Sequence, residues 1–262
     1  MRIAVCIKQV PATHEVSIDP ETKRIQREGI ASELNPFDLY AVEQAVRLVA
    51  EVGGEVVALS MGPRQAQASL REAMAMGADR AVLLSDRAFA GSDTWATSYA
   101  LACGIRSLGA VDLVLCGKQA IDGDTAQVGP GIAAHLGWPQ VTYVSAMTDV
   151  SAERIVVKRM NEEGYEVVEL TLPGVMTVVK DINVPRVPTL PSVLASRRAD
   201  VPVRTAEAVG ADPEQLGLGG SPTRVVKINP PPPRQGKTEV VEGTAAECAR
   251  RIVHELRRRS IV

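Results

Sequence analysis

Short and almost continuous apolar runs alternate with helical patterns in the first half of the chain. Four such runs precede Gly137: RIAVCIK, EVVALSM, RAVLLS and VDLVLCG. Continuous apolar runs are typical of parallel strands that are covered on both faces. The intervening segments have helical spacing, as in NPFDLYAVEQAVRLVAEVGG, where one side carries Leu39, Val42, Val46 and Val49. The alternation predicts a doubly wound α/β domain with a Rossmann-like, mainly parallel sheet.

The first of these helices carries signals at both ends. Asn35 is a natural N-cap, Pro36 suits the first helical position, and Asp38 closes the first turn. Gly53 and Gly54 end the pattern. We therefore expect a helix that begins at residue 36 and is capped by the side chain of Asn35.

Beyond Val141 the pattern changes to alternation with period two. The runs VTYVSAMTDV, RIVVKRMN, YEVVELTLPG and VMTVVKDI are separated by turn signals at Asn161–Gly164 and Pro173–Gly174. Such alternation predicts half-buried strands joined by tight turns. We expect four antiparallel strands that extend the same sheet or follow its edge.

Prolines accumulate after Asn183 and include the run Pro230–Pro233. A segment of this composition cannot bury a core of its own. We therefore divide the chain into an α/β domain, residues 1–183, and an arm with a C-terminal helix, residues 184–262, which lies against something else. The arginines that end GTAAECARRIVHELRRRS suit the helix dipole, and docking on an acidic partner is the alternative.

Composition limits the function classes. The chain has 262 residues, 45% of them hydrophobic, with net charge −2 and a pI near 6.0. These values argue against a general nucleic-acid binder, and no apolar run approaches the roughly 20 residues needed to cross a bilayer. The N-terminus lacks a signal-peptide layout, the three histidines are too scattered for a zinc site, and no CxxC pair occurs. We expect a cytoplasmic protein with free thiols at Cys6, Cys103, Cys116 and Cys248.

Ligands of open parallel sheets bind at the carboxyl ends of the strands. Four loops follow the predicted parallel strands: Lys8–His14, Gly62–Gln65, Ser85–Asp93 and Gly117–Thr125. None contains GxGxxG or GxxxxGK[ST], so neither the dinucleotide fingerprint nor the P-loop is present. Any nucleotide site must be built in another way.

The loop GKQAIDGDTAQVGPG connects the fourth run to a helical pattern. Asp124 and Gln127 have the spacing of a capping box, which predicts a helix that starts beside Thr125. The free amides of that helix start would attract an anion. A purely structural cap is the alternative explanation for these two residues.

Other residues of the same loop are not explained by a cap. Gly117 and Gly123 permit close approach of the backbone to a ligand, and Lys118 lies beside them. Asp122 would be free to accept hydrogen bonds from a ribose or from loop donors. Nucleotide binding is therefore the favoured interpretation.

A second loop leads from the third run into the helix TWATSYALACG. Asp93, Thr94, Thr97 and Ser98 place one carboxylate and three hydroxyls in its first turns. A cap requires one or two of them. Two polar helix starts at neighbouring strand ends predict a ligand longer than a mononucleotide.

The segments NPFDLYAVEQAVRL, AMAMGADRAVLL, GKQAIDGDTAQVGP and LGWPQVTY closely resemble the β subunit of electron transfer flavoproteins. The resemblance implies an adenine-nucleotide-binding α/β domain and a C-terminal arm that wraps the α subunit, which holds the electron-carrying FAD. It also implies nucleotide contacts at Cys6, Asn35, Phe37, Asp38, Met61, Gly117, Lys118, Gln119, Ala120, Ile121, Asp122, Gly123, Asp124, Thr125, Ala126, Gln127 and Val128.

Two branches of that family differ in the cofactor of the β subunit. In the housekeeping branch the β subunit binds AMP structurally. In the electron-bifurcating branch it holds a second FAD that accepts hydride from NADH, and a ferredoxin-type protein is the low-potential acceptor. The segments CIKQVPAT and DRAFAGSDTWATS resemble the bifurcating branch. In both branches Leu190 of TLPSVLASRR would anchor a dehydrogenase.

We therefore expect the β subunit of a flavoprotein heterodimer with its own FAD, contacted also by Asp93, Thr94 and Thr97. An AMP-binding docking subunit is the alternative. A stand-alone hydrolase or ligase is disfavoured because the chain has no SGG loop and no nucleophile–base pair. The cofactor carries the chemistry in such a protein, so no catalytic acid or base is assigned.

Overall fold

The computed structural model describes residues 1–12, 32–227 and 238–262. The chain forms two compact units, Met1–Val225 and Val226–Val262. The proline run 230–233 and the last two residues of the loop 8–14 lie outside the described residues. None of the helices described is long and apolar enough to span a membrane.

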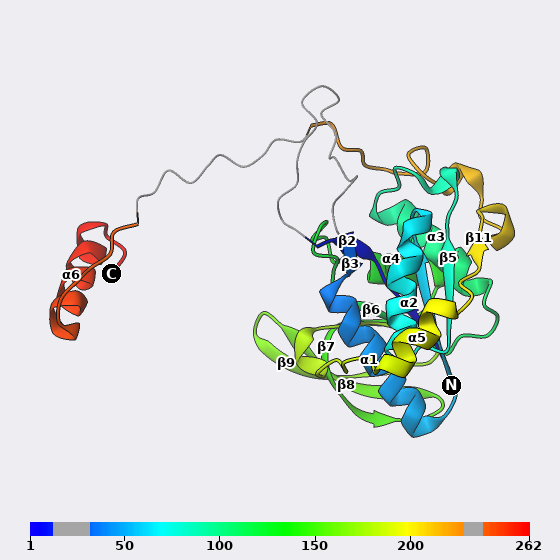
Figure 1. Ribbon diagram of the computed structural model, residues 1–262, viewed down its shortest axis with the longest axis horizontal. Helices are drawn as coiled ribbons and strands as arrows, with labels where there is room; N and C mark the ends of the chain where they lie inside the picture. The colour runs from blue at the N-terminus through cyan, green and yellow to red at the C-terminus, as the bar shows by residue number, and fades with distance from the viewer. Residues whose placement is uncertain (13–31, 228–237) are drawn as a thin grey trace. The chain divides into compact units, whose positions relative to one another are not determined.

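The larger unit is built on a nine-stranded sheet with the order β11-β5-β4-β1-β6-β10-β7-β8-β9 (Figure 1). The pairs from β11 to β7 are parallel, which confirms the predicted Rossmann-like, mainly parallel α/β fold. The strands are β1 Arg2–Cys6, β4 Glu55–Met61, β5 Arg80–Leu84, β6 Leu113–Gly117, β7 Gln140–Val150, β8 Arg154–Asn161, β9 Gly164–Thr171, β10 Gly174–Val178 and β11 Val203–Arg204. A separate antiparallel pair consists of β2 Gln9–Pro11 and β3 Ser32–Leu34.

The antiparallel extension is shorter than predicted. Strands β7, β8 and β9 form it, with Asn161 opposite Gly164 at the hairpin turn. The prediction that the fourth run is also antiparallel was wrong, because β10 lies between β6 and β7 and is parallel to both. All five residues of β10 are buried, as expected for a central strand covered on both faces.

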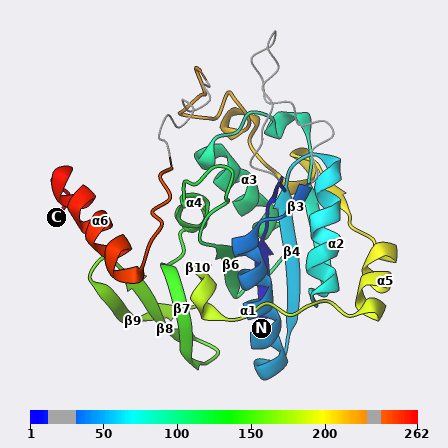
Figure 2. The ribbon, with the colours of Figure 1, turned by 60° about the vertical axis from the view of Figure 1, so that its left-hand side comes forward.

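Helices cover both faces of the sheet (Figure 2). The helices are α1 Pro36–Val52, α2 Gln67–Ala75, α3 Thr94–Arg106 and α4 Val128–Leu136. Strand β1 shows the division into two cores. Ile3 and Val5 belong to the apolar cluster with α1 and α2, whereas Ala4 and Cys6 belong to the cluster with α3 and α4. Successive side chains of a strand point to opposite faces of the sheet, so neighbouring residues of β1 belong to different cores.

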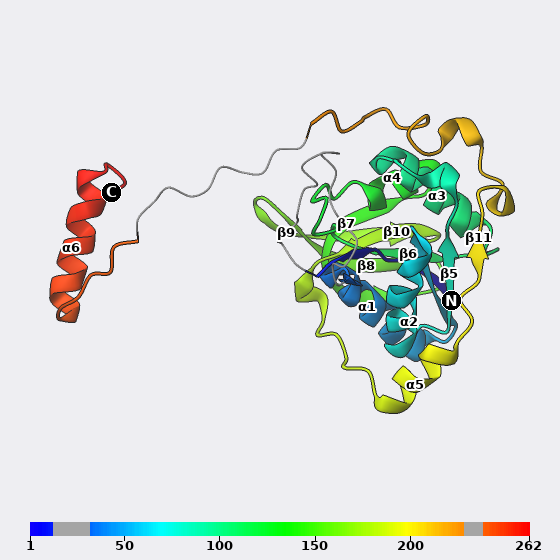
Figure 3. The same cartoon turned by 45° about the horizontal axis from the view of Figure 1, so that its top comes forward.

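Residues between 184 and 225 lie against the α/β domain. Helix α5, Leu190–Arg198, lies beside α2, and β11 pairs with β5 at the edge of the sheet (Figure 3). The second unit contains α6, Ala245–Arg258, whose start has a capping box between Thr244 and Glu247. The wrapping of a partner by residues 184–262 stays a prediction.

Candidate functional site

The sheet has its topological switch point between β1 and β6. The chain runs from β1 outward to β4 and β5 and then returns to form β6 on the other side of β1. Cys6 at the end of β1 pairs in register with Cys116 of β6. Ligands of open α/β sheets bind at such a point, outside the carboxyl ends of the strands. The loops that follow β1 and β6 meet here.

Asn35 joins these two loops. Its backbone amide donates to the Lys8 carbonyl at 2.9 Å, its Nδ2 donates to the Gln119 carbonyl at 2.9 Å, and its Oδ1 accepts from the Ile121 amide at 3.1 Å. The side chain is fully buried. Asn35 is the N-cap residue of α1, which begins at Pro36 as expected, but its side chain makes no cap hydrogen bond, because its donor and acceptor satisfy the loop after β6.

Asp38 fixes the same junction from the first turn of α1. Its buried carboxylate accepts from the Lys8 amide at 2.7 Å. Burial raises the pKa of Asp38 to about 7, although hydrogen bonds from Asn35, Lys8 and Gly117 act in the opposite direction. A Cβ at Gly117 would lie 2.4 Å from Oδ1 of Asp38. Gly117 is thus required by a contact within the protein.

Charged side chains rim the junction. Lys8 Nζ contacts both carboxylate oxygens of Asp122, at 2.6 and 2.7 Å. The expectation that Asp122 would be free to accept from a ribose or from loop donors was therefore wrong, because both of its carboxylate oxygens are paired with Lys8. Lys118 Nζ lies 5.6 Å from the centre of the Phe37 ring and 5.4 Å from that of Tyr143, within the range of cation–π attraction.

The capping box predicted between Asp124 and Gln127, both of which are described, does not form at the start of α4. Helix α4 begins at Val128 with Gln127 as its N-cap residue, so Thr125 lies before the helix. Asp124 accepts instead from the side-chain amide of Gln119. Asp124 has a φ of 51°, which removes it from the geometry that a capping box requires.

Three non-glycine residues around the junction have left-handed backbone conformations. Their φ angles are 51° at Asp124, 54° at Ala126 and 60° at Tyr143. Residues held in this region cost free energy and cluster at functional sites. Gly123, by contrast, has open space where a Cβ would stand, so its expected role toward a ligand stays a prediction.

Asp93 is the N-cap residue of α3. Its Oδ1 accepts from the amides of Trp95 at 3.0 Å and Ala96 at 3.1 Å, and its Oδ2 accepts from the amide and hydroxyl of Thr223. Burial raises the pKa of Asp93, but these hydrogen bonds outweigh it and hold the pKa below its ordinary value. Both oxygens are thus used within the protein.

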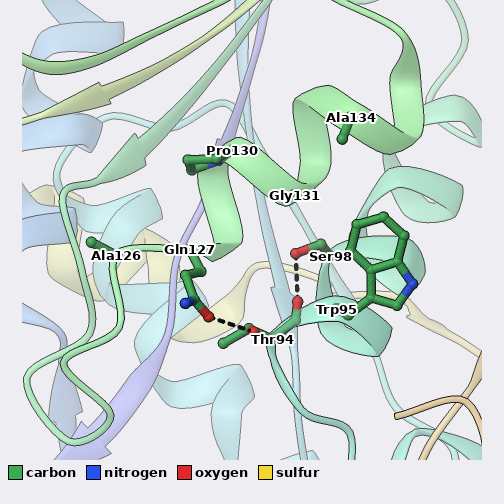
Figure 4. Close-up of a pocket in the computed structure, with 8 residues that line it drawn as sticks. All are labelled: Thr94, Trp95, Ser98, Ala126, Gln127, Pro130, Gly131 and Ala134. Atoms are coloured by element: carbon green, nitrogen blue, oxygen red, sulfur yellow. Dashed lines mark hydrogen bonds between the residues drawn. The ribbon is translucent and has the colours of Figure 1, made fainter. Parts of the chain in front are cut away.

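The starts of α3 and α4 are joined directly. The Thr94 hydroxyl donates to Oε1 of Gln127 at 2.9 Å, and the buried Ser98 hydroxyl donates to the Val128 carbonyl at 3.2 Å. A pocket of about 370 Å³ opens beside this contact (Figure 4). It is lined by Thr94, Trp95, Ser98, Ala126, Gln127, Pro130, Gly131 and Ala134. Thr97 is half-buried on the same helix.

One wall of the pocket is aromatic. Trp95 is 47% exposed, and its ring centre lies 4.1 Å from that of His135. Burial lowers the pKa of His135, so its ring is neutral near neutral pH. Sequence reasoning named Gln127 but missed Pro130, Gly131 and Ala134 of α4, although their spacing from Gln127 places all four on one face of a helix.

Met61, Cys6 and Leu190 are the remaining candidates from the sequence, and they do not line the pocket. Met61 is half-buried at the end of β4 and packs on the α3/α4 cluster. A hydrogen bond with Cys6, together with burial, raises the pKa of Cys116, so this thiol is protonated. Within the described ranges, no three His, Cys, Asp or Glu residues could hold a metal. Leu190 stands apart as the first residue of α5 and is 71% exposed.

Comparison with known proteins decides the family. A model of the electron transfer flavoprotein domain matches residues 22–209, more than half of the chain. The chain belongs to the electron transfer flavoprotein family. An electron transfer flavoprotein subunit beta from Thermoanaerobacterium thermosaccharolyticum is 47% identical over 263 residues, covering 100% of both chains. Subunit CarD of the caffeyl-CoA reductase-Etf complex of Acetobacterium woodii is 47% identical with the same coverage. Protein FixA of Azorhizobium caulinodans is 44% identical, covering 99% of this chain and 95% of FixA.

These similarities confirm the resemblance to electron transfer flavoprotein β subunits that the motifs indicated. The motif GKQAIDGDTAQVGP forms the loop after β6, at the switch point of the sheet.

Proposed function

We propose that this chain is the β subunit of a heterodimeric electron transfer flavoprotein and passes electrons, together with an α subunit, between dehydrogenases and an acceptor. The family match and the similarity to a protein named as a β subunit over the whole chain support this proposal. The pairing with α also gives a role to α6, which buries none of its residues. An exposed helix with an apolar side is suited to a partner surface.

The cofactor of this subunit is FAD. The lining of the pocket carries this part of the proposal, because Ala126 and Gln127 of the loop after β6 line it together with residues of α3. The loop could hold an adenine nucleotide. The pocket adds hydroxyl groups and the exposed Trp95 ring, which suit a polar chain that ends in a planar group.

The residues present fit such a group in their chemistry. Hydroxyls of Thr94 and Thr97 would hydrogen-bond it, Trp95 would cover an aromatic ring, and the free amides at the start of α4 would face phosphate charge. FAD supplies one- and two-electron transfer when bound. The chain itself binds, orients and shields it.

The bifurcating type is the branch that we propose, with NADH as hydride donor and a ferredoxin-type protein as one acceptor. The segments CIKQVPAT and DRAFAGSDTWATS support this assignment, and so does the similarity to CarD, whose name places it in a reductase complex. In the same system Leu190 would dock the dehydrogenase. Its exposure of 71% supports that role.

AMP is the alternative cofactor, and one observation favours it. Both carboxylate oxygens of Asp93 already accept hydrogen bonds from the α3 amides and from Thr223. Asp93 therefore has less capacity to accept hydrogen bonds from a ligand than its place in the sequence indicated. The junction of Asn35, Asp38 and Gly117 would be sufficient for a mononucleotide.

Counting the released cofactors distinguishes the two. The chain is purified with its α subunit, supplied with excess FAD, and denatured, and the supernatant is analysed for flavin and adenine nucleotides. We expect two FAD and almost no AMP per heterodimer. One FAD and one AMP would establish the housekeeping type and end the FAD proposal for this subunit.

A further inference from the structure

Helix α1 buries a second charged residue, five positions beyond Asp38 of the junction. Glu43 is only 2% exposed. Its carboxylate accepts from the backbone amide of Arg186 at 3.1 Å, from Nε at 2.7 Å and from Nη2 at 3.3 Å. Arg47, one turn further along α1, donates to it as well. A buried carboxylate requires such partners, and Glu43 receives three hydrogen bonds from Arg186, which is 143 residues away.

The residues before Arg186 are held along the same helix. Nη2 of Arg47 donates to the Val184 carbonyl at 2.9 Å. Nδ2 of Asn183 donates to the Tyr40 carbonyl at 3.0 Å and to the side chain of Gln44. Residues 183–186, which precede α5, are thus held against α1 by hydrogen bonds of their backbone and side chains (Figure 2).

A second attachment follows α5. Nε2 of Gln67 in α2 donates to the Val201 carbonyl at 2.9 Å. Ser196 is buried on the side of α5 that meets the domain. Between the two attachments the chain presents apolar side chains to solvent: Val187 is 89% exposed, Leu190 71% and Leu194 47%. The attachments at residues 183–186 and at Val201 therefore determine where these exposed side chains lie.

We propose that Glu43 is a positioning residue that, through Arg186, fixes the entry of the exposed segment 187–194 and so sets where Leu190 is presented to a dehydrogenase. This inference rests on the proposed docking role of Leu190. A carboxylate is needed because every atom that faces it is a donor. A glutamine of the same size would turn its own NH₂ group toward one of the arginines.

Two variants of the full heterodimer test the proposal. Glu43→Gln keeps the side-chain volume, and Arg186→Ala removes a side chain that is 42% exposed while Arg47 stays as a charged partner of Glu43. We expect amide hydrogen exchange in residues 184–194 to become about tenfold faster, the equivalent of one charged hydrogen bond. Arg186→Lys should restore part of the protection, since a point charge replaces the fork. Arg80→Ala, which removes the arginine of another ion pair with a glutamate, is the matched control.

Electron transfer gives the second readout. With a dehydrogenase that exchanges electrons with the unaltered heterodimer, both variants should raise KM severalfold and leave kcat unchanged. Reduction of ferricyanide, which needs no docking, should proceed at the original rate, with the flavin content unaltered. Arg80→Ala should match the original protein in every measurement.

Leu190→Ala separates the two possible failures. If Leu190→Ala raises KM but Glu43→Gln and Arg186→Ala change neither KM nor exchange, the positioning role of Glu43 is overturned while docking by Leu190 stands. If Leu190→Ala itself leaves KM unchanged, the docking role fails, and with it the positioning role. Faster exchange over the entire domain would overturn the proposal by showing a general loss of stability.

Discussion

The side-chain hydroxyl of Thr94 lies 2.9 Å from Oε1 of Gln127 and joins the first residue of α3 to the residue that precedes α4. Thr94 follows β5 along the chain and Gln127 follows β6, and these two strands are not adjacent, contrary to the expectation from the sequence, because β4 and β1 lie between them. Their contact places the pocket beside Trp95 next to the loop after β6. A cofactor that uses both would be held at two points.

Removing the hydroxyls of Thr94 and Thr97 should loosen one flavin selectively. Thr94→Val combined with Thr97→Val keeps the shape and removes two hydrogen-bonding groups, each worth roughly 0.5–1.5 kcal/mol. We expect one of two FAD molecules to dissociate more readily from the heterodimer during equilibrium dialysis. Thr148→Val, on the exposed side of β7, is a control that removes a hydroxyl far from the site. Equal retention of both flavins would contradict the assignment of these threonines.

Gly117 and Gly123 should respond differently to the same added methyl group. Gly117→Ala places a Cβ within 3 Å of Asp38 and of the Phe37 backbone, so it should lower the free energy of unfolding by about 1–3 kcal/mol and weaken nucleotide binding. Gly123→Ala meets no protein atom within 4 Å. It should therefore leave stability unchanged and weaken nucleotide binding only where the ligand approaches closely. Urea unfolding and calorimetric titration measure the two effects. Unaltered binding in Gly123→Ala would show that the ligand lies elsewhere.

Asp38 should make stability depend on pH. Its pKa is raised from 3.8 to about 7 by burial, so the folded protein binds this proton more tightly than the unfolded chain. The associated stabilisation is complete below pH 3.8 and is lost as the pH rises through about 7. The stability of Asp38→Asn, relative to the original protein, should therefore increase over this range in urea denaturation. Asp149→Asn, at an exposed ion pair, should show no such trend. A constant difference for Asp38→Asn would mean that Asp38 does not titrate there.

Leu190→Ala should weaken delivery of electrons to or from the dehydrogenase without loss of cofactor. Leu190 is 71% exposed, so it contributes little to the core, and full burial of a leucine side chain against a partner would stabilise the complex by about 1.5–3 kcal/mol. Val167→Ala on β9 is matched in exposure, at 70%, and should have no effect. Steady-state kinetics and flavin absorbance measure the two properties. Unfolding or loss of nucleotide would assign Leu190 to the domain itself.

Sequence patterns predicted the features that depend on near neighbours in the chain. The apolar runs correspond to β1, β4, β5 and β6, and α1 begins at Pro36 as its end signals indicate. Asp93 caps α3 because a cap needs only the amides two and three residues further on. Asn35 carries the same local signal but makes other bonds, since its buried amide meets the loop after β6.

By itself the sequence determined the α/β alternation, the family resemblance and the loops of the candidate site, because strand and helix periods and long motifs are local properties. Only the tertiary structure decided the contacts between distant segments. It placed β10 between two parallel strands and paired Asp122 with Lys8, 114 residues away. It also paired Glu43 with Arg186, 143 residues away. Such pairs depend on how whole elements pack, and a buried polar group such as the carboxylate of Glu43 then needs a partner that packing brings near it.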